Sequence, residues 1–308
     1  MATPTVHVLH GIQTPTQFYG QVESSTPSPQ LQELLATAGN YTQPLFLGVR
    51  GAQPQVSFRT PQLATLLAEA GLFGADLTAG NVDVYYRKAV NRGTLIAAAT
   101  TSHTRLRIAK AMMYLRQISA GHQREAIGDA TILATYDGTN APIVPAGSLA
   151  LAGTATSAEH FCLGPVSING SAIDGIDDCT IDLQPTLRTR GDASQPYPTF
   201  NGVRSIAPVI TLRGAALEPW VNYGLNGIAL SALIVYLRKV NTDVGSGNMY
   251  VLDATAQHIK FTAANGIVHV PQASGGDGSD ATTEVKILLR SADSSTACMT
   301  VATASAIT

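Results

Sequence analysis

Two segments of the chain carry residue types that bind hard cations. Asp174, Asp177, Asp178 and Asp182 gather four carboxylates in one short stretch, and Gly275–Asp280 reads GGDGSD. Carboxylate oxygens are the ligands that calcium and magnesium prefer. The GGxGxD pattern binds calcium only when several units stack, and a single unit is present. The spacing predicts a solvated strand edge or turn for the acidic cluster and a flexible loop for the glycine-rich segment, and it leaves cation binding at either one open.

Catalytic patterns are absent from the sequence. The seven histidines are scattered, and none forms the HExxH pair of a zinc enzyme. The sequence contains no GxSxG, no phosphate-binding P-loop and no Rossmann fingerprint. The three cysteines, Cys162, Cys179 and Cys298, suggest neither a disulfide framework nor a metal site. We therefore expect no enzymatic activity, no catalytic residue, no bound metal and no cofactor.

The composition indicates a folded chain with little charged surface. Of its 308 residues, 45% are hydrophobic, which is enough to build a core, whereas only 13% are charged. The formal net charge is −2, so the strong positive field of a tight nucleic-acid binder is missing. The amino terminus lacks a secretion-signal pattern, and no apolar run is long enough to span a membrane. These features predict synthesis in a cytosol and no membrane span.

An internal repeat is the strongest pattern in the sequence. Phe46–Arg59 (FLGVRGAQPQVSFR) and Phe200–Arg213 (FNGVRSIAPVITLR) share Phe, Gly-Val-Arg, Pro and a final Arg at an offset of 154, half of the chain. A repeat of this length predicts two copies of one domain. We place the first at 1–150 and the second at 151–308, on either side of the linker-like Pro142–Glu159.

Weaker similarities continue along both halves. They pair Val82–Lys88 with Ile234–Lys239, Arg105–Ile108 with His258–Phe261, Ala130–Tyr136 with Val285–Ser291 and, most weakly, Val6–Gly11 with Pro165–Gly170. The alternation of Arg105–Ile108 places Arg105 and Arg107 on the polar face of a half-buried strand. The same alternation in the second half places His258 and Lys260 there. A sheet with a basic outer row is therefore expected twice.

The fold class predicted is mainly β, with a short helix beside each domain, or α+β by strict count. Capping and exit residues favour helices after Ser28-Pro29 and Thr60-Pro61, ending at Gly39 and Gly71. A third helical segment is expected within Ala215–Tyr223. Strands are expected at Gln55–Arg59, Val82–Lys88, Arg105–Ile108, Met112–Ile118 and Ala130–Tyr136.

These features together resemble the major tail tube proteins of long-tailed bacteriophages. The resemblance rests on the tandem β-domains, the low charge and the missing export signal and catalytic motif, and it is to the subtype with a duplicated tube domain. It implies a β-sandwich or partial barrel in each domain. It also implies that three chains form a pseudo-hexameric ring, and that rings stack into a hollow tube. DNA would pass through this tube without specific binding.

The resemblance also implies partners and a location. These are other copies of the chain, a tape-measure protein, a tail terminator and a distal-tail protein, within the virion of a phage. The loops Gly121–Gly128 and Ala273–Asp280 are the candidates for ring-to-ring stacking. Their candidate residues are Gly121, His122, Arg124, Glu125, Gly275, Asp277 and Asp280. Arg105, Arg107, His258 and Lys260 are candidates for charges at an interface or in the lumen, and we expect them to face outward or to pair with acids.

Two alternatives remain at this stage. One is a distal-tail, hub or baseplate ring of the same fold, which would form single rings instead of a polymer. The other belongs to a different class, a carbohydrate-binding β-sandwich or a hydrolase. That class favours an export signal and clustered aromatic residues, whereas this chain has a single tryptophan, Trp220, and 6% aromatic residues.

Overall fold

The chain folds into β-sheets, as the composition predicts. The computed structural model describes residues 6–36, 46–91, 94–154, 159–215, 222–223, 226–242, 247–276 and 279–308. These residues form 25 strands and one helix with described bounds, α1. None of the sheets that they form closes into a barrel. The predicted fold class, mainly β with a short helix, is therefore confirmed.

A six-stranded antiparallel sheet forms one layer of the first half. Its order is β13-β10-β8-β1-β2, and β9 pairs with β8. The strands are β1 (Val6–Gln13), β2 (Phe18–Tyr19), β8 (Val82–Asn91), β9 (Thr94–Leu95), β10 (His103–Ile108) and β13 (Val144–Leu149). β13 occupies a third of Pro142–Glu159, the segment that the composition assigns to a linker. That assignment was wrong because Val144–Leu149 pairs with β10 along its length.

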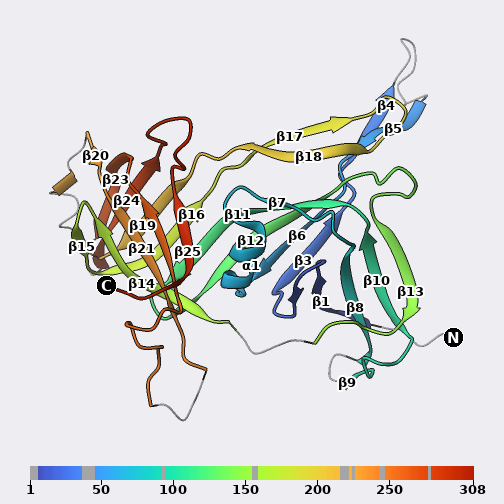
Figure 1. The fold of residues 1–308 in the computed structure, drawn as a ribbon, viewed down its shortest axis with the longest axis horizontal. Helices are drawn as coiled ribbons and strands as arrows, with labels where there is room; N and C mark the ends of the chain where they lie inside the picture. The colour runs from blue at the N-terminus through green and yellow to red at the C-terminus, as the bar shows by residue number, and fades with distance from the viewer. Residues whose placement is uncertain are drawn as a thin grey trace.

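A ten-stranded sheet runs through both halves and is the largest layer (Figure 1). Its order is β20-β23-β24-β19-β16-β11-β12-β6-β3, and β7 pairs with β11. The strands are β3 (Ser24–Ser28), β6 (Gln55–Thr60), β7 (Ala75–Asp76), β11 (Ala111–Gly121), β12 (Arg124–Ala134), β16 (Ile176–Asp182), β19 (Val209–Gly214), β20 (Ile228–Leu230), β23 (Gly266–Gly276) and β24 (Ser279–Leu289). The two halves therefore share one sheet, and the predicted boundary near residue 150 stays a prediction.

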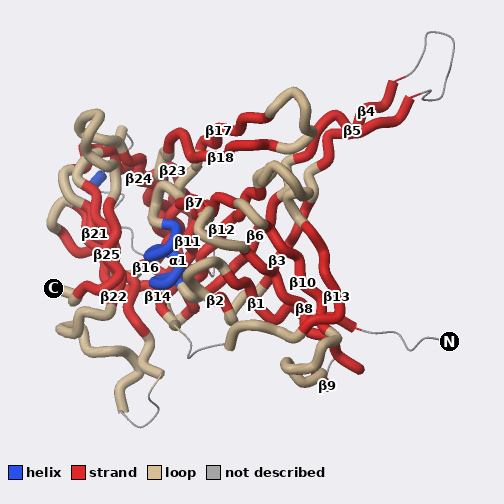
Figure 2. Tube along the Cα trace, turned by 45° about the vertical axis from the view of Figure 1, so that its right-hand side comes forward, coloured by secondary structure: helices blue, strands red, loops and turns tan. Residues whose placement is uncertain are grey.

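Three smaller sheets complete the described residues. A five-stranded sheet, β15-β14-β21-β22-β25, forms the second layer of the second half. Its strands are β14 (Phe161–Ile168), β15 (Ser171–Ile173), β21 (Leu233–Lys239), β22 (His258–Ala263) and β25 (Thr300–Ser305). Two hairpins form separate two-stranded sheets. One consists of β4 (Leu31–Ala36) and β5 (Phe46–Ala52), and the other of β17 (Thr186–Gly191) and β18 (Pro198–Ser205). Figure 2 shows β4 and β5 extending away from the sheets.

The strand pairings of the first half recur in the second half with matching registers. The order β2-β1-β8-β10-β13 has its counterpart in β15-β14-β21-β22-β25. Arg59 lies opposite Asp129 in one half, and Arg213 lies opposite Glu284 in the other. Register shifts also match, since one falls between Leu115 and Gln117 of β11 and another between His269 and Gln272 of β23. The paired strands of one half thus have counterparts in the other half at offsets near 154 residues.

The pairings correct two of the correspondences expected from the sequence. His103, rather than Arg105, is the counterpart of His258, because both precede the same register shift in β10 and β22. Leu9 lies opposite Tyr86 and Leu163 lies opposite Leu237, so β1 corresponds to Phe161–Ile168. The expected match of Val6–Gly11 with Pro165–Gly170 was therefore shifted. Short alternating strands resemble one another at several registers, so sequence similarity alone placed these matches incorrectly.

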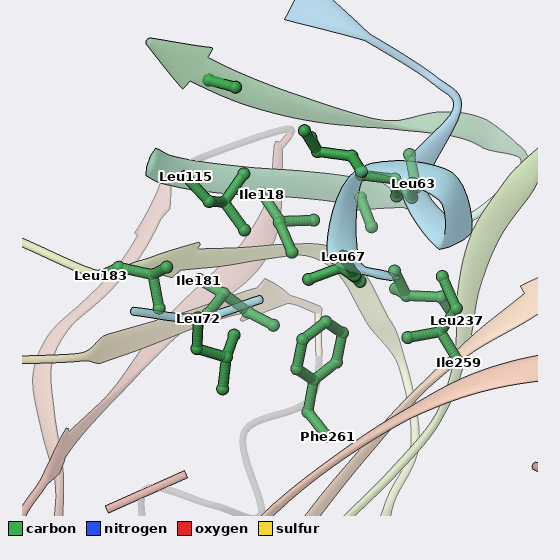
Figure 3. Packing of buried hydrophobic residues seen from close by; sticks show 14 of the residues in the cluster. Leu63, Leu67, Leu72, Leu115, Ile118, Ile181, Leu183, Leu237, Ile259 and Phe261 are labelled. Carbon is green, nitrogen blue, oxygen red and sulfur yellow. The ribbon is translucent and has the colours of Figure 1, made fainter. Parts of the chain in front are cut away.

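Helix α1 (Leu63–Ala70) fills the space where the two halves meet. Its apolar face, Leu63, Leu66, Leu67 and Ala70, is buried. Figure 3 shows Leu63 and Leu67 among side chains from both halves, including Leu115 and Ile118 of β11, Ile181 of β16, Leu237 of β21 and Ile259 and Phe261 of β22. The helix predicted after Thr60-Pro61 is confirmed. The junction thus has an apolar core in addition to its strand pairing.

Two other helical segments were expected. The one after Ser28-Pro29 was wrong, because Leu31–Ala36 forms β4 and pairs with β5. A six-residue segment with leucines at several spacings suits a helix or a strand, and the partner strand decides. The segment within Ala215–Tyr223 lies mostly outside the described residues.

Candidate subunit interface at the open edges of the sheet

The junction between the halves is an antiparallel pairing of β11 with β16. Gln117–Gly121 of the first half lies opposite Asp178–Asp182 of the second, with Ser119 facing Thr180. Around the end of β11, the backbone N–H of His122 donates to the Asp177 carbonyl at 2.7 Å. The Arg124 guanidinium forms an ion pair with the Asp178 carboxylate. A regular ladder with an ion pair at its end therefore joins the halves.

Both participants in this junction have counterparts whose outer edges are open in the described residues. Asp178–Asp182 of β16 corresponds to Ser24–Ser28 of β3. Asp178 lies opposite Arg213 of β19, and Ser24 lies opposite the equivalent Arg59 of β6. The register also relates Gln117–Gly121 of β11 to Gln272–Gly276 of β23. β3 ends the ten-stranded sheet, and on the outer side of β23 only Gly266–Val268 is paired, with β20. The open edges of β3 and β23 in one chain are therefore equivalent to the two strands that pair at the β11·β16 junction.

The open edges are short, polar and exposed. Ser24 and Thr26 of β3 are exposed, as are Gln272 and Ser274 of β23. Exposed edges with unpaired backbone groups are templates for pairing with another chain. Pro27 stands where the paired strand has Ile181, and it removes one backbone donor from β3. A single proline on an edge limits indiscriminate strand addition and leaves the other donors and acceptors in place.

One face of the ten-stranded sheet carries hydroxyl groups and balanced charges. The Ser57 and Thr131 hydroxyls lie 3.1 Å apart. Arg59 contacts Asp129 at 2.9 Å, and its counterpart Arg213 contacts Glu284 at 2.8 Å. A groove of about 510 Å³ lies on this face across the junction, lined by three arginines and three acids: Arg59, Arg124, Arg213, Glu23, Glu125 and Asp178. The groove thus contains equal numbers of cationic and anionic side chains.

The residues predicted for ring stacking lie in hairpins rather than in long loops. β11 continues to Gly121 and β12 begins at Arg124, so only His122 and Gln123 form the turn. Gln123 has a positive φ of 56°, and this geometry suits such a tight turn. The predicted loop Gly121–Gly128 was therefore wrong over most of its length. Arg124 contacts Asp178, and the Glu125 carboxylate contacts the His160 imidazole, so both are engaged within the chain.

The corresponding hairpin of the second half ends β23 and begins β24. Gly275 lies in β23 and Asp280 in β24, whereas Asp277 lies outside the described residues. The predicted loop Ala273–Asp280 was also mostly wrong, since Ser274 pairs with Thr282 and their hydroxyls lie 2.7 Å apart. The stacking role of either hairpin stays a prediction.

The acidic cluster lies within the sheet rather than at its edge. Asp177, Asp178 and Asp182 belong to β16, which pairs with β11 on one side and β19 on the other. The Asp182 carboxylate accepts the N–H of Gln184 at 3.1 Å. Within the described ranges, no three His, Cys, Asp or Glu side chains gather in a way that could hold a metal ion. Asp174 is exposed and lies in the turn between β15 and β16, so the expected turn holds for this residue. The expected strand edge was wrong for the other three, because the second-half strand continues the first-half sheet.

The four predicted surface charges separate into two kinds. Arg107 makes a two-point contact with Asp83, with both N–O distances 2.9 Å, and Arg105 lies 3.6 Å from the same carboxylate. The Asp83 contacts raise the pKa of Arg107. Lys260 places its ammonium 5.4 Å from the Tyr236 ring centroid. These three side chains thus lie at the surface of the smaller sheets and contact groups of their own half.

His258 was wrongly predicted to lie on the surface. It is fully buried, its Nδ1 accepts the Lys239 N–H at 3.0 Å, and its Nε2 donates to the Leu252 carbonyl at 3.1 Å. Its counterpart His103 is equally buried and holds Lys88 and Ala97 in the same way. Both rings therefore bridge a strand and a loop.

The strand β3 and the open outer edge of β23 were not predicted from the sequence. The segment Ser24–Ser28 has no apolar alternation, so a strand was not expected there. The repeat offset of 154 would have mapped it onto Asp178–Asp182, a segment with clear alternation around Cys179 and Ile181. Applying the same offset beyond the most similar segments of the repeat would therefore have predicted a strand at Ser24–Ser28.

Comparisons with known proteins add no identification. The chain matches no protein-family model and no curated protein. Across the parts of the chain that the structure describes, no helix has the length and apolar character needed to cross a membrane.

Proposed function

We propose that the chain is a structural subunit that forms closed rings with copies of itself, and that these rings stack into the hollow tail tube of a long-tailed bacteriophage. The single observation that carries the proposal is the β11·β16 junction, whose two sides recur as open edges at β23 and β3. A head-to-tail contact of this kind closes into a ring when its rotation divides the circle. Three chains with two equivalent halves each would give a pseudo-hexameric ring.

The polar sheet face is the surface that we assign to the lumen. Its arginines contact acids of the same face, as Arg59 does Asp129 and Arg213 does Glu284. Phosphate groups bind strongly where lysine and arginine are unpaired. A lumen with paired charges would let DNA pass without holding it, and no catalytic step is needed. The tape-measure, terminator and distal-tail partners follow from the resemblance to tail tube proteins and belong to this proposal.

The test is negative-stain electron microscopy of the purified chain over a concentration series. Hollow tubes, or stacking rings with threefold symmetry, are expected. The control is Thr26→Lys/Ser274→Lys, which places like charges opposite each other on the two edges and should prevent rings. Rings that never stack would support a hub or distal-tail ring in place of a tube. A monomer at every concentration would contradict ring formation altogether.

A further inference from the structure

The hairpin of the second half packs on the first half of the same chain. Leu187 of β17 and Val203 of β18 lie against a buried cluster of Met112, Tyr114 and Leu133 on β11 and β12. The backbone adds polar contacts, since the Tyr136 N–H donates to the Pro198 carbonyl at 2.8 Å. An isolated two-stranded hairpin is marginal in water. The apolar surface beneath it therefore holds β17 and β18 in place.

The first-half hairpin has the same pairing but no such support within the described residues. Glu33 lies opposite Val49 in β4 and β5, as Leu187 lies opposite Val203, and both hairpins have a register shift just before this pair. Val49 is 55% exposed. In Figure 2 this hairpin projects beyond the sheets, whereas β17 and β18 lie over them. Its apolar side chain thus lacks the surface that its counterpart has.

The surface that corresponds to the buried cluster is uncovered in the second half. Ile267 is the counterpart of Met112 and Leu288 that of Leu133, since each pair lies opposite one another in the β23·β24 or β11·β12 hairpin. Met112 and Leu133 are buried, whereas Ile267 is 50% and Leu288 40% exposed. The base of the β4·β5 hairpin is held by the Ala52 N–H, which donates to the Pro196 carbonyl at 2.9 Å. One chain therefore carries an exposed apolar surface and an exposed hairpin side chain, Val49, that match the two sides of a contact it already makes.

The glycines beside the two surfaces match as well. Gly74 has a φ of 78°, and a Cβ added there would lie 3.3 Å from a Val203 methyl group. Its counterpart Gly227 has a φ of 73° and the same close approach to the backbone carbonyl of β23 that Gly74 has to β11. At Gly227 the near methyl group is that of Ile267, 3.3 Å from an added Cβ, so the two glycines match in backbone geometry and Ile267 borders this position.

We propose that β4 and β5 of one copy of the chain lie on Ile267 and Leu288 of a second copy. This inference rests on the proposed ring, because β3 and β4 are separated by only two residues. If β3 pairs with β23 of a neighbour, the β4·β5 hairpin that follows β3 lies next to β23 and β24 of that neighbour. Within one chain, the pairing of β16 with β11 places the following β17·β18 hairpin next to β11 and β12 in the same way. Val49 then takes the place that Val203 has within the chain.

Charge supports the choice of a second copy as the occupant. Glu33 replaces Leu187 on the hairpin face, and Lys286 replaces Thr131 on the sheet face that carries Ile267 and Leu288. The added acid on one side and the added base on the other are complementary. Opposite charges across a contact favour the correct partner and fix its register.

The experiment crosslinks assembled Val49→Cys/Ile267→Cys chains with a short bismaleimide. We expect dimers and higher species on a denaturing gel, with a 49–267 link identified by mass spectrometry. Gln53→Cys/Thr189→Cys is the positive control, because these side chains lie 3.2 Å apart in an exposed contact, and its link should form within one chain. Val90→Cys/Ile267→Cys is the negative control, because Val90 is similarly exposed at 58% but lies on β8 of another sheet.

A second variant tests the contact without a reagent. Val49→Asp should reduce the assembled fraction at a fixed concentration by about tenfold, because it places a carboxylate against an apolar surface. The circular dichroism of its monomer should be unchanged, since Val49 is exposed. Rings or tubes that lack the 49–267 link and tolerate Val49→Asp would overturn the hairpin contact and leave the ring standing. Linked oligomers that never close would keep the hairpin contact and overturn the ring, and a strict monomer would overturn both.

Discussion

Three polar side chains connect separate elements of the scaffold. His103 and His258 each connect a strand N–H with a loop carbonyl at equivalent positions. Glu69 accepts hydrogen bonds from the hydroxyls of Thr14 and Tyr19 at 2.5 and 2.6 Å, which ties α1 to the first sheet. Buried polar groups need such partners, because leaving one unpaired is costly. His103, His258 and Glu69 each have such partners, and each contact joins two separate elements of the chain.

The alternation of polar and apolar residues along a strand predicted the placement of some polar side chains correctly. It placed Arg105 and Arg107 away from Leu106 and Ile108, and Arg107 is indeed at the surface. It failed for His258, because the Gln257–His258 entry to β22 is covered by the Leu252 loop. Strand alternation reports the two faces of a sheet but not the loops that cover a face. The acceptor of a buried imidazole comes from such a loop and has no sequence signature.

Asp83 is a buried carboxylate whose loss should reduce the stability of the first sheet. Its side chain is only 8% exposed and faces both Arg105 and Arg107. Asp83→Ala should lower the free energy of unfolding by about 2–4 kcal/mol, because it leaves two guanidinium groups without their carboxylate. Denaturant unfolding checks this. Tyr85→Phe removes a 3.2 Å hydrogen bond to the same carboxylate and should cost only about 1 kcal/mol. Equal losses for the two variants would contradict this assignment.

The native cysteines should be inert in the folded chain. All three are free and buried, and burial raises the pKa of the Cys179 thiol to about 12. A raised pKa keeps this group a protonated thiol well above pH 8, and only the thiolate reacts. Labelling with a thiol reagent at pH 8 should therefore await unfolding and quicken in denaturant. Stoichiometric labelling of Cys179 within seconds under native conditions would show that it is accessible.

At the scale of elements, neighbours determined what local pattern left ambiguous. The leucine-rich segment after Pro29 became β4 because β5 pairs with it, and Val144–Leu149 became β13 because β10 has an open side. The helix after Pro61 was predictable, since Leu63, Leu66, Leu67 and Ala70 lie on one helical face. Its cap was not. No side chain of the helix's own N-cap residue, Gln62, closes the first turn.

Glu159 supplies the missing cap from a distant part of the sequence. Its carboxylate accepts the N–H groups of Ala64 and Thr65 at 3.1 and 3.2 Å, and the Thr65 hydroxyl at 3.0 Å. A carboxylate at a helix N-terminus is favoured by the unpaired N–H groups and the helix dipole. Glu159→Ala should lower the free energy of unfolding by about 1–2 kcal/mol, and Glu159→Gln by less. Thermal unfolding of both variants measures this, and no change in either would exclude the capping role.

Charges introduced on the two open edges should prevent or restore assembly, depending on their signs. Thr26 and Ser274 are the counterparts of Thr180 and Ser119, which lie opposite each other at the junction. Thr26→Lys/Ser274→Lys should abolish rings, whereas Thr26→Lys/Ser274→Glu should restore them, because opposite charges across a strand pair attract. Sedimentation velocity separates the two outcomes. Identical assembly of both variants would mean that these edges do not meet.

For the whole molecule, the sequence itself indicates the two similar halves. Gly48-Val49-Arg50 and Gly202-Val203-Arg204 occur at an offset of 154, and the strand pairings around them recur with the same spacing. The continuous sheet was not predictable, because strand pairing between distant segments leaves no local pattern. The junction of β11 with β16 in turn defines which edges remain open and which apolar surface stays uncovered. The features that carry the proposed assembly therefore lie in the part of the fold that sequence patterns alone did not reveal.

The measurement that tests ring closure most directly is disulfide formation between Thr26→Cys and Ser274→Cys in one chain. Under mild oxidation of the assembled protein, we expect a covalent series that ends at a circular trimer, with the 26–274 bond identified by mass spectrometry. Ser119→Cys/Thr180→Cys should form the equivalent bond within one chain and shows that the geometry suits a disulfide. Assemblies in which this control bond forms and the 26–274 bond does not would contradict the proposal that β3 and β23 close the ring.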